Sequence, residues 1–129
     1  MSEENVEIAR RFTETVARGD YEGAAAMLAP DFTVDDTDIP ESTSTDSFYE
    51  WVGRWDAAFE SWRIEDIEVR AITEDRTLSL FRIYARGRSS RVELSRDDAV
   101  ITEFRDARIV RIVYYNNHTQ ALEAAGLSE

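Results

Sequence analysis

The sequence predicts an α+β domain in which helices are grouped ahead of a long antiparallel sheet. Apolar residues recur at helical spacing in the first half of the chain, the period changes to two from Trp62 onward, and turn residues divide the second half into four runs. Helices followed by consecutive strands are typical of this class. The chain has 129 residues, the size of one domain, so we assign residues 1–129 to a single domain.

Two helices are predicted before the first strand. The first covers residues 3–18, where apolar side chains recur every three or four positions. Gly19 can adopt the left-handed conformation that ends a helix. Asp20 can then cap a second, shorter helix that runs to about residue 28 and is closed by Pro30.

A strand and a third helix follow. Phe32, Val34 and Asp36 alternate with other residues, which indicates a short strand that places all three on one face. Residues 37–46 are polar and form a loop, and the last two of them can cap a third helix that runs to about Ser61.

The second half of the chain predicts an antiparallel meander. Its four strands are expected at about 63–73, 77–87, 90–105 and 108–117. Turns are expected at 74–75, 87–90 and 106–107. A final amphipathic segment covers residues 118–127 and ends at Gly126.

The charge of the chain limits its partners. Aspartate and glutamate outnumber lysine and arginine by 27 to 15, so the formal net charge is -12. Such a protein repels phosphate backbones and anionic lipid surfaces, and we expect neither nucleic acid nor a membrane as a partner. The acidic composition fits both a salt-rich cytoplasm and a GC-rich genome, and it does not separate the two.

Composition also limits the chemistry. All 15 basic residues are arginine, which excludes a Schiff-base lysine. The chain has no cysteine, and His118 is its single histidine, so a thiolate nucleophile and a multi-histidine metal centre are excluded. We expect no metal and no cofactor. Because the sequence shows neither a signal-peptide pattern nor an apolar run of about 20 residues, we expect a cytoplasmic protein.

Three segments carry a resemblance to a known family: the Gly19-Asp20 joint, residues 28–36 (LAPDFTVDD) and residues 107–115 (ARIVRIVYY). With the order of elements, they make the chain similar to the nuclear transport factor 2-like superfamily, and within it to the SnoaL-like, polyketide cyclase-like branch. The resemblance implies a cone-shaped barrel, in which a curved antiparallel sheet wraps around three helices of the N-terminal half. An apolar pocket is expected at its wide end. The superfamily includes cyclases, isomerases, dehydratases and non-catalytic binding domains, so the fold alone does not choose a function.

Strand parity, anchored by this resemblance, predicts which residues face the pocket and bind a ligand. They are Phe12, Val34, Phe48, Trp51, Trp55, Phe81, Ile83, Val100, Thr102, Ile112, Tyr114 and Asn116. Most of them are apolar, which is typical of a site for a small organic molecule. The alternative is that the same aromatic side chains interdigitate as an ordinary core.

Two residues, Asp36 and His118, are predicted to be catalytic. A carboxylate on the apolar inner face of a strand loses hydration, which raises its pKa and suits a general base. In steroid isomerases, the acid at the corresponding position abstracts a proton. His118 falls on the same side if the last strand extends that far, and its imidazole can shuttle a proton near neutral pH. The alternatives place Asp36 in water beside a loop and His118 in water at a helix start.

The resemblance argues against two known chemistries. Phe12 and Val100 match the oxyanion-hole donors of the steroid isomerase branch, yet neither side chain can donate a hydrogen bond. Asn116 stands where many SnoaL-like chains carry aspartate, and an amide cannot take a proton at neutral pH. A further acid, Asp98, faces inward by strand register unless Asp97-Asp98 forms a bulge.

The outer face of the sheet predicts a surface for assembly. Its mixture of aromatic residues, aliphatic residues and arginine-acid pairs suits a homodimer interface, and the residues expected there are Arg82, Tyr84, Arg86, Ile101, Glu103, Arg111, Val113 and Tyr115. The alternative is a solvated sheet face with cross-strand ion pairs.

Three functional hypotheses remain. The first is a SnoaL-like protein that binds a small, mostly apolar organic molecule and uses Asp36 in a cofactor-independent proton transfer of cyclase, isomerase or dehydratase type. The second is a non-catalytic ligand-binding or dimerisation module of the same fold. The third is a protein-interaction domain that uses the outer sheet face. The sequence leaves open whether the protein is an enzyme.

Overall fold

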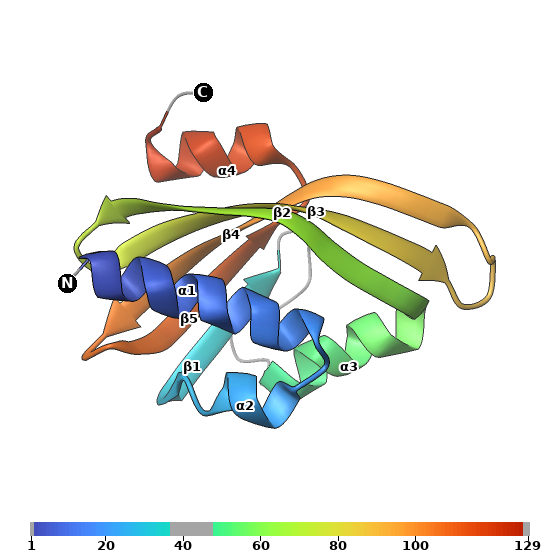
Figure 1. The fold of residues 1–129 in the computed structure, drawn as a ribbon, viewed down its shortest axis with the longest axis horizontal. Helices are drawn as coiled ribbons and strands as arrows, with labels where there is room; N and C mark the ends of the chain where they lie inside the picture. The colour runs from blue at the N-terminus through green and yellow to red at the C-terminus, as the bar shows by residue number, and fades with distance from the viewer. Residues whose placement is uncertain (1, 37–47, 128–129) are drawn as a thin grey trace.

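The computed structural model describes residues 2–36 and 48–127 (Figure 1). Within them, helices and strands follow one another as predicted for an α+β domain. Their bounds are α1 Ser2–Ala17, α2 Tyr21–Ala25, β1 Leu28–Asp36, α3 Phe48–Ala58, β2 Phe59–Thr73, β3 Arg76–Gly87, β4 Glu93–Arg105, β5 Arg108–Tyr115 and α4 His118–Ala125. The α+β class is confirmed.

The five strands form one sheet in the order β1-β5-β4-β3-β2. From β2 to β5 each strand is antiparallel to the next, which confirms the meander. The edge strand β1 pairs with β5 in parallel, with Val34 opposite Ile112 and Asp36 opposite Tyr114. The cone-like curved sheet is therefore mixed and open rather than wholly antiparallel and closed.

Local sequence signals account for several element ends. The Asp20 carboxylate accepts a hydrogen bond from the Gly23 backbone N–H at 2.9 Å, which caps α2 as predicted. Asp106 and Ala107 have φ angles of 52° and 64°, the left-handed values that suit a tight two-residue hairpin between β4 and β5. Gly126 has a φ of 74° and ends α4.

Two boundaries differ from the sequence-based expectation. β1 begins at Leu28, ahead of Pro30, because it is an edge strand in which the missing proline N–H needs no sheet partner. α3 ends at Ala58 rather than near Ser61, because the chain enters the ladder with β3 from Phe59 onward. The expected caps of α3, Thr45 and Asp46, lie outside the described residues.

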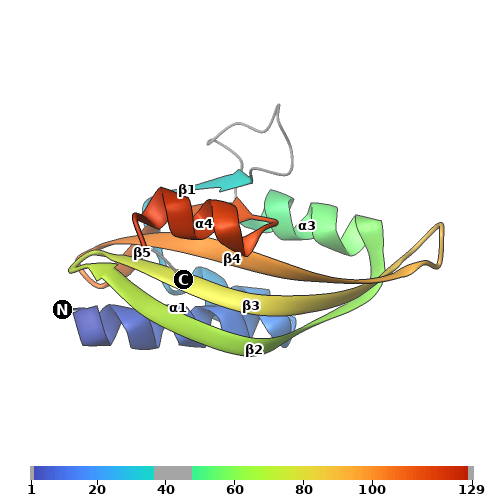
Figure 2. The same cartoon turned by 90° about the horizontal axis from the view of Figure 1, so that it is seen from above.

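The helices cover opposite faces of the sheet. α1, α2 and α3 lie on one face and α4 lies on the other, while β3 and β4 project beyond the helices toward their connecting turn (Figures 1 and 2). We call the face toward α1 the inner face and the face toward α4 the outer face. No helix in the described part of the chain is long and apolar enough to cross a bilayer.

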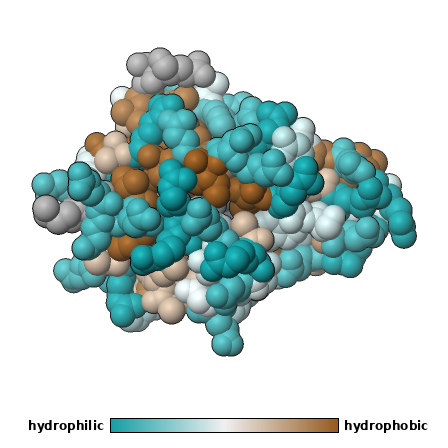
Figure 3. Space-filling view, viewed as in Figure 1, coloured by the Kyte–Doolittle hydropathy of each residue, from teal (hydrophilic) through white to brown (hydrophobic). Residues whose placement is uncertain are grey.

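Each face has its own apolar cluster. The larger one joins α1 and α3 to the inner face and includes Phe12, Phe48, Trp51, Phe81 and Ile112. The smaller one joins α4 to the outer face and consists of Leu78, Leu80, Ala99, Ile101, Val113, Ala121, Leu122 and Ala125. Figure 3 shows a band of apolar surface between α4 and α1, over the edge strand β2. The inner cluster provides the walls of the candidate site.

Candidate functional site

An apolar cavity lies between the inner face of the sheet and the helices α1 and α3. It is lined by Phe12, Thr13, Val16, Trp51, Val52, Trp55, Trp62, Ile64, Phe81, Ile83, Val100, Ile112 and Tyr114. The space open to the centre of a water molecule is about 40 Å³. The space is small because aromatic side chains of the lining, such as Trp51, Trp55 and Tyr114, pack against one another.

A second, more polar cavity adjoins the first. It is lined by Asp36, Trp51, Arg54, Trp55, Ala58, Phe59 and Arg96, and the same measure of volume gives about 160 Å³. Trp51 and Trp55 belong to both cavities, so their indole rings form the shared wall. An apolar space thus meets a carboxylate and two guanidinium groups at one place in the molecule.

Asp36 is the last residue of β1, and its side chain lies on the inner face of the sheet. Only 4% of the residue is exposed, and its Oδ2 accepts a hydrogen bond from the Trp51 indole Nε1 at 2.9 Å. Trp51 lies on α3, so this contact joins the edge strand to the helix that covers the cavity. The carboxylate is therefore buried, oriented by a donor, and in contact with the polar cavity.

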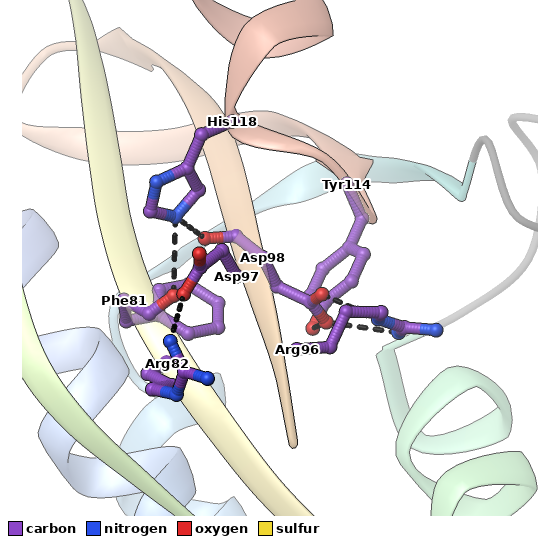
Figure 4. A network of polar contacts seen from close by, with 7 residues as sticks. All are labelled: Phe81, Arg82, Arg96, Asp97, Asp98, Tyr114 and His118. Atoms are coloured by element: carbon purple, nitrogen blue, oxygen red, sulfur yellow. Dashed lines mark hydrogen bonds and ion pairs between the residues drawn. The ribbon is translucent and has the colours of Figure 1, made fainter. Parts of the chain in front are cut away.

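A second buried carboxylate belongs to Asp98 on β4, which is fully buried. The β3–β4 register runs without interruption past Asp97 and Asp98, so the bulge considered as an alternative does not form. Arg96 holds the carboxylate through Nε at 2.5 Å and Nη2 at 2.9 Å, and the Tyr114 hydroxyl donates to Oδ2 (Figure 4). Strand parity allowed the inward orientation of the Asp98 side chain. It did not predict its two partners, because Tyr114 lies on the neighbouring strand β5 and Arg96 lies two residues away on β4.

Tyr114 connects the polar groups to the aromatic wall. Its ring centroid lies 5.5 Å from that of Trp51 and 5.6 Å from that of Trp55. Burial, followed by the negative charge of Asp98, raises the pKa of its hydroxyl well above the usual 10.0, and Asp36 contributes in the same direction. Tyr114 therefore stays protonated at neutral pH and remains a donor to Asp98.

His118 lies at the first residue of α4, on the other side of β4 from the Asp98 carboxylate (Figure 4). Its Nε2 is 2.8 Å from the Asp98 carbonyl oxygen and 3.2 Å from the Phe81 carbonyl oxygen. Because carbonyl oxygens only accept, Nε2 carries the proton. His118 is not among the residues that line the two cavities. These contacts tie α4 to the backbone at Asp98.

The structure divides the predicted ligand-binding residues into two sets. Those that line the apolar cavity are Phe12, Trp51, Trp55, Phe81, Ile83, Val100, Ile112 and Tyr114. Those outside both cavities are Val34 and Phe48, which belong to the core, Thr102, which is buried elsewhere, and Asn116, which is half-buried.

Sequence reasoning missed several lining residues. Trp62 and Ile64 alternate at the start of β2, and the same period-two signal that placed Phe81 and Ile83 could have found them. Val52 lies four residues after Phe48, on the same side of α3. Arg54 and Arg96 had no detectable signal, because charged residues on a helix and a strand are most often solvated.

No group of three or more metal-ligating side chains is assembled among residues 2–36 and 48–127. The chemistry that these residues can supply is that of carboxylates, guanidinium groups and a phenol beside an apolar space. This combination suits proton transfer and the stabilisation of a charged oxygen.

A family model described as "SnoaL-like domain" matches residues 9–112. A proposed polyketide cyclase from Xanthomonas campestris pv. campestris has 18% identity and a TM-score of 0.79, over 96% of this chain and 98% of that chain. AclR, a proposed hydroxylase from Streptomyces galilaeus, has 17% identity and a TM-score of 0.71, over 100% of this chain and 89% of that chain.

A hypothetical protein from Catenulispora acidiphila DSM 44928 with a ketosteroid isomerase-like fold has 16% identity and a TM-score of 0.72, over 95% of this chain and 94% of that chain. No curated protein matches the chain. At these identities the solved structures establish the fold and leave the activity open.

Proposed function

We propose that this chain, which belongs to the SnoaL-like domain family, binds a small, mostly apolar organic molecule beneath α3 and catalyses a cofactor-independent proton transfer. In this proposal Asp36 is the general base. The ligand takes up the polar cavity and, by displacing the ring of Trp55, part of the apolar one.

The observation that carries the proposal is the position of the Asp36 carboxylate. It is 4% exposed, is held by the Trp51 indole, and contacts the polar cavity where that cavity meets the apolar one. A carboxylate kept from water and fixed in orientation is suited to remove a proton from carbon. The names of the similar solved structures include both a cyclase and a hydroxylase, so they do not choose the reaction.

The step needs no oxidant, reductant or metal. The Asp36 carboxylate takes a proton from the carbon next to a carbonyl group, and the electron pair of that C–H bond becomes part of the C=C bond of an enolate. The carbonyl oxygen receives the negative charge. The Asp36 carboxylic acid then returns a proton, or a deuteron in D₂O, to the same carbon or to another one. The result is exchange of the C–H hydrogen with solvent, isomerisation, or the start of a ring closure.

Exchange of the α-hydrogens of 2-indanone in D₂O, followed by ¹H NMR, tests the proposal. This ketone is small and flat, and it carries the acidic C–H bonds that the step requires. We expect the protein to accelerate exchange over buffer. Asp36→Asn keeps an oxygen that can accept the Trp51 hydrogen bond, yet we expect it to lower the rate by about 100-fold or more, because an amide is no base.

The matched control is Asp35→Asn, which removes the same charge from the neighbouring residue. Asp35 lies on the outer face beside Arg111, with 3.5 Å between Oδ2 and Nη2. We expect its exchange rate to stay within about twofold of the wild type. A wild-type rate equal to that of buffer, or an Asp36→Asn variant as fast as the wild type, contradicts the proposal.

A non-catalytic module is the second candidate, and the small volume of the apolar cavity favours it. The three tryptophan indole N–H signals of ¹⁵N-labelled protein separate the two candidates. Shifts of these signals on titration with 2-indanone, without catalysed exchange, support a binding module. Unshifted signals support a cone filled by its own side chains.

We also propose that two copies pair through the part of the outer face that α4 leaves uncovered. The Arg82 guanidinium carbon lies 5.8 Å from the centroid of the Tyr84 ring and that of Arg63 lies 4.3 Å from it, an arginine-aromatic surface of the kind enriched at interfaces. Sedimentation equilibrium is expected to give a dimer, and Arg82→Glu with Tyr84→Glu a monomer.

A further inference from the structure

We infer that Arg96 is a further catalytic residue of the proposed reaction, which contacts the carbonyl oxygen of the substrate and stabilises the negative charge that develops there. The inference rests on the proposed function and names the substrate class: a carbonyl compound whose oxygen points toward β4 while its acidic carbon faces Asp36. Its evidence is the network around Asp98, which the role of Asp36 leaves unexplained.

The apolar cavity is lined mainly by side chains that cannot donate a hydrogen bond to an enolate oxygen. Phe12 and Val100 line it and cannot donate hydrogen bonds. Trp51 has one indole N–H and gives it to Asp36, and Tyr114 has one hydroxyl proton and gives it to Asp98. The charged oxygen that the base creates needs a hydrogen-bond donor that is already oriented toward it.

Arg96 meets this need because it lines the same polar cavity as Asp36. Its guanidinium is a planar fork of N–H donors, and Nε and Nη2 donate to the Asp98 carboxylate. The side chain of Arg96 is 32% exposed, whereas that of Asp98 is 0% exposed. The guanidinium is thus held from behind by a buried anion.

Such an arrangement fixes the donor before a substrate arrives. The two hydrogen bonds orient the plane of the guanidinium, and the Tyr114 hydroxyl in turn holds the Asp98 carboxylate (Figure 4). Donors that are already oriented stabilise a developing charge without reorganisation. Asp98 and Tyr114 are therefore positioning residues, and Arg96 is the group that contacts the substrate.

A purely structural role is a poor explanation for this network. Buried ion pairs contribute little more to stability than well-packed apolar residues of the same size. Asp36 on β1 is opposite Tyr114 on β5, and the Tyr114 hydroxyl donates to the Asp98 carboxylate that also holds Arg96. Tyr114 therefore connects the strand that carries the proposed base to the group that holds the proposed oxygen contact.

The test compares two variants in the 2-indanone exchange assay. Asp98→Asn keeps Arg96 but loosens its anchor, whereas the double variant Arg96→Gln with Asp98→Asn removes the guanidinium as well and leaves no unpaired buried charge. We expect the double variant to show a kcat about 100- to 1000-fold below that of Asp98→Asn, with KM within about threefold, because the charge exists only in the transition state.

The matched control is the double variant Arg105→Gln with Asp31→Asn, which removes an exposed ion pair of the same residue types, with 2.5 Å between Nη2 and Oδ1, from a place that lines neither cavity. We expect wild-type exchange from it, and circular dichroism to confirm that all variants fold. If Arg96→Gln with Asp98→Asn has the same kcat as Asp98→Asn alone, the proposed role of Arg96 is overturned and that of Asp36 stays intact. Absence of exchange in the wild type overturns both.

Discussion

Two pairs of neighbouring aspartates, Asp35-Asp36 and Asp97-Asp98, divide between the two faces of the sheet. Asp97 on the outer face pairs with Arg82 while 53% of its side chain stays exposed. Asp98 on the inner face is fully buried and holds Arg96 and Tyr114. Asp35 and Asp36 differ in the same way, the first beside Arg111 and the second held by Trp51.

The comparison shows that burial, and not residue type, separates the two kinds of acid. An exposed pair is screened by water and contributes little to stability. A buried carboxylate has lost its hydration, so each of its donors must be present in the folded protein. We therefore expect the same substitution to have a large effect on the inner face and a small one on the outer face.

The largest effect is expected from Asp98→Asn. This change removes the charge that pairs with Arg96 and leaves one oxygen where two accepted from Arg96 and Tyr114, and we expect it to lower the free energy of unfolding by about 3 kcal/mol. Breaking a buried ion pair lowers the free energy of unfolding by about 3–5 kcal/mol. We expect a value at the lower end of this range, because the Arg96 side chain is partly exposed and water can solvate its charge. Urea unfolding followed by tryptophan fluorescence measures the change.

Asp97→Asn is the matched outer-face change, and we expect it to cost less than about 1 kcal/mol. High salt should reduce this small cost further, while leaving that of Asp98→Asn nearly unchanged. Similar costs for the two variants would show that the two faces of β4 are not as different as their exposure indicates.

A smaller effect is expected from the neighbouring tyrosines of β5. Tyr114→Phe keeps the ring contacts with Trp51 and Trp55 but removes the hydroxyl that donates to Asp98, at a cost of about 2 kcal/mol for a hydrogen bond to a charged group. Tyr115→Phe removes the same atom on the outer face, and we expect a change within about 0.5 kcal/mol. Urea unfolding at neutral pH measures both.

The same two variants also differ in their response to alkaline pH. Burial raises the pKa of Tyr114 well above 10.0 in the folded protein, and that of Tyr115 is raised in the same direction. The unfolded chain loses these protons first, so stability falls as the pH rises above 10. Tyr114→Phe should flatten this decline more than Tyr115→Phe. Equal slopes for both variants would contradict the assignment of the raised pKa to Tyr114.

Much of the fold was predictable because it depends on neighbours in the chain. The cap formed by Asp20, the hairpin at Asp106 and Ala107, and the end of α4 at Gly126 all use backbone preferences of single residues. Period-two alternation likewise predicted that Phe81 and Ile83 share a face, which is the face that lines the cavity.

The rest depended on contacts between distant segments. The parallel pairing of β1 with β5 explains why the strand starts at Leu28, and the ladder with β3 explains why α3 stops at Ala58. The position of α4 over Leu78, Leu80 and Ile101 gave no separate signal, because an apolar residue on the outer face of a strand has the same period as one on the inner face.

The sequence by itself determined the class of the fold, because alternation and caps act through local geometry, and the resemblance of three segments indicated the family. Only the tertiary structure decided which donor each buried carboxylate meets. Trp51 reaches Asp36 from a helix, and Tyr114 reaches Asp98 from the next strand. Hydrogen bonds extend over only about 3 Å, so side chains far apart in the chain become partners only when packing brings their atoms together.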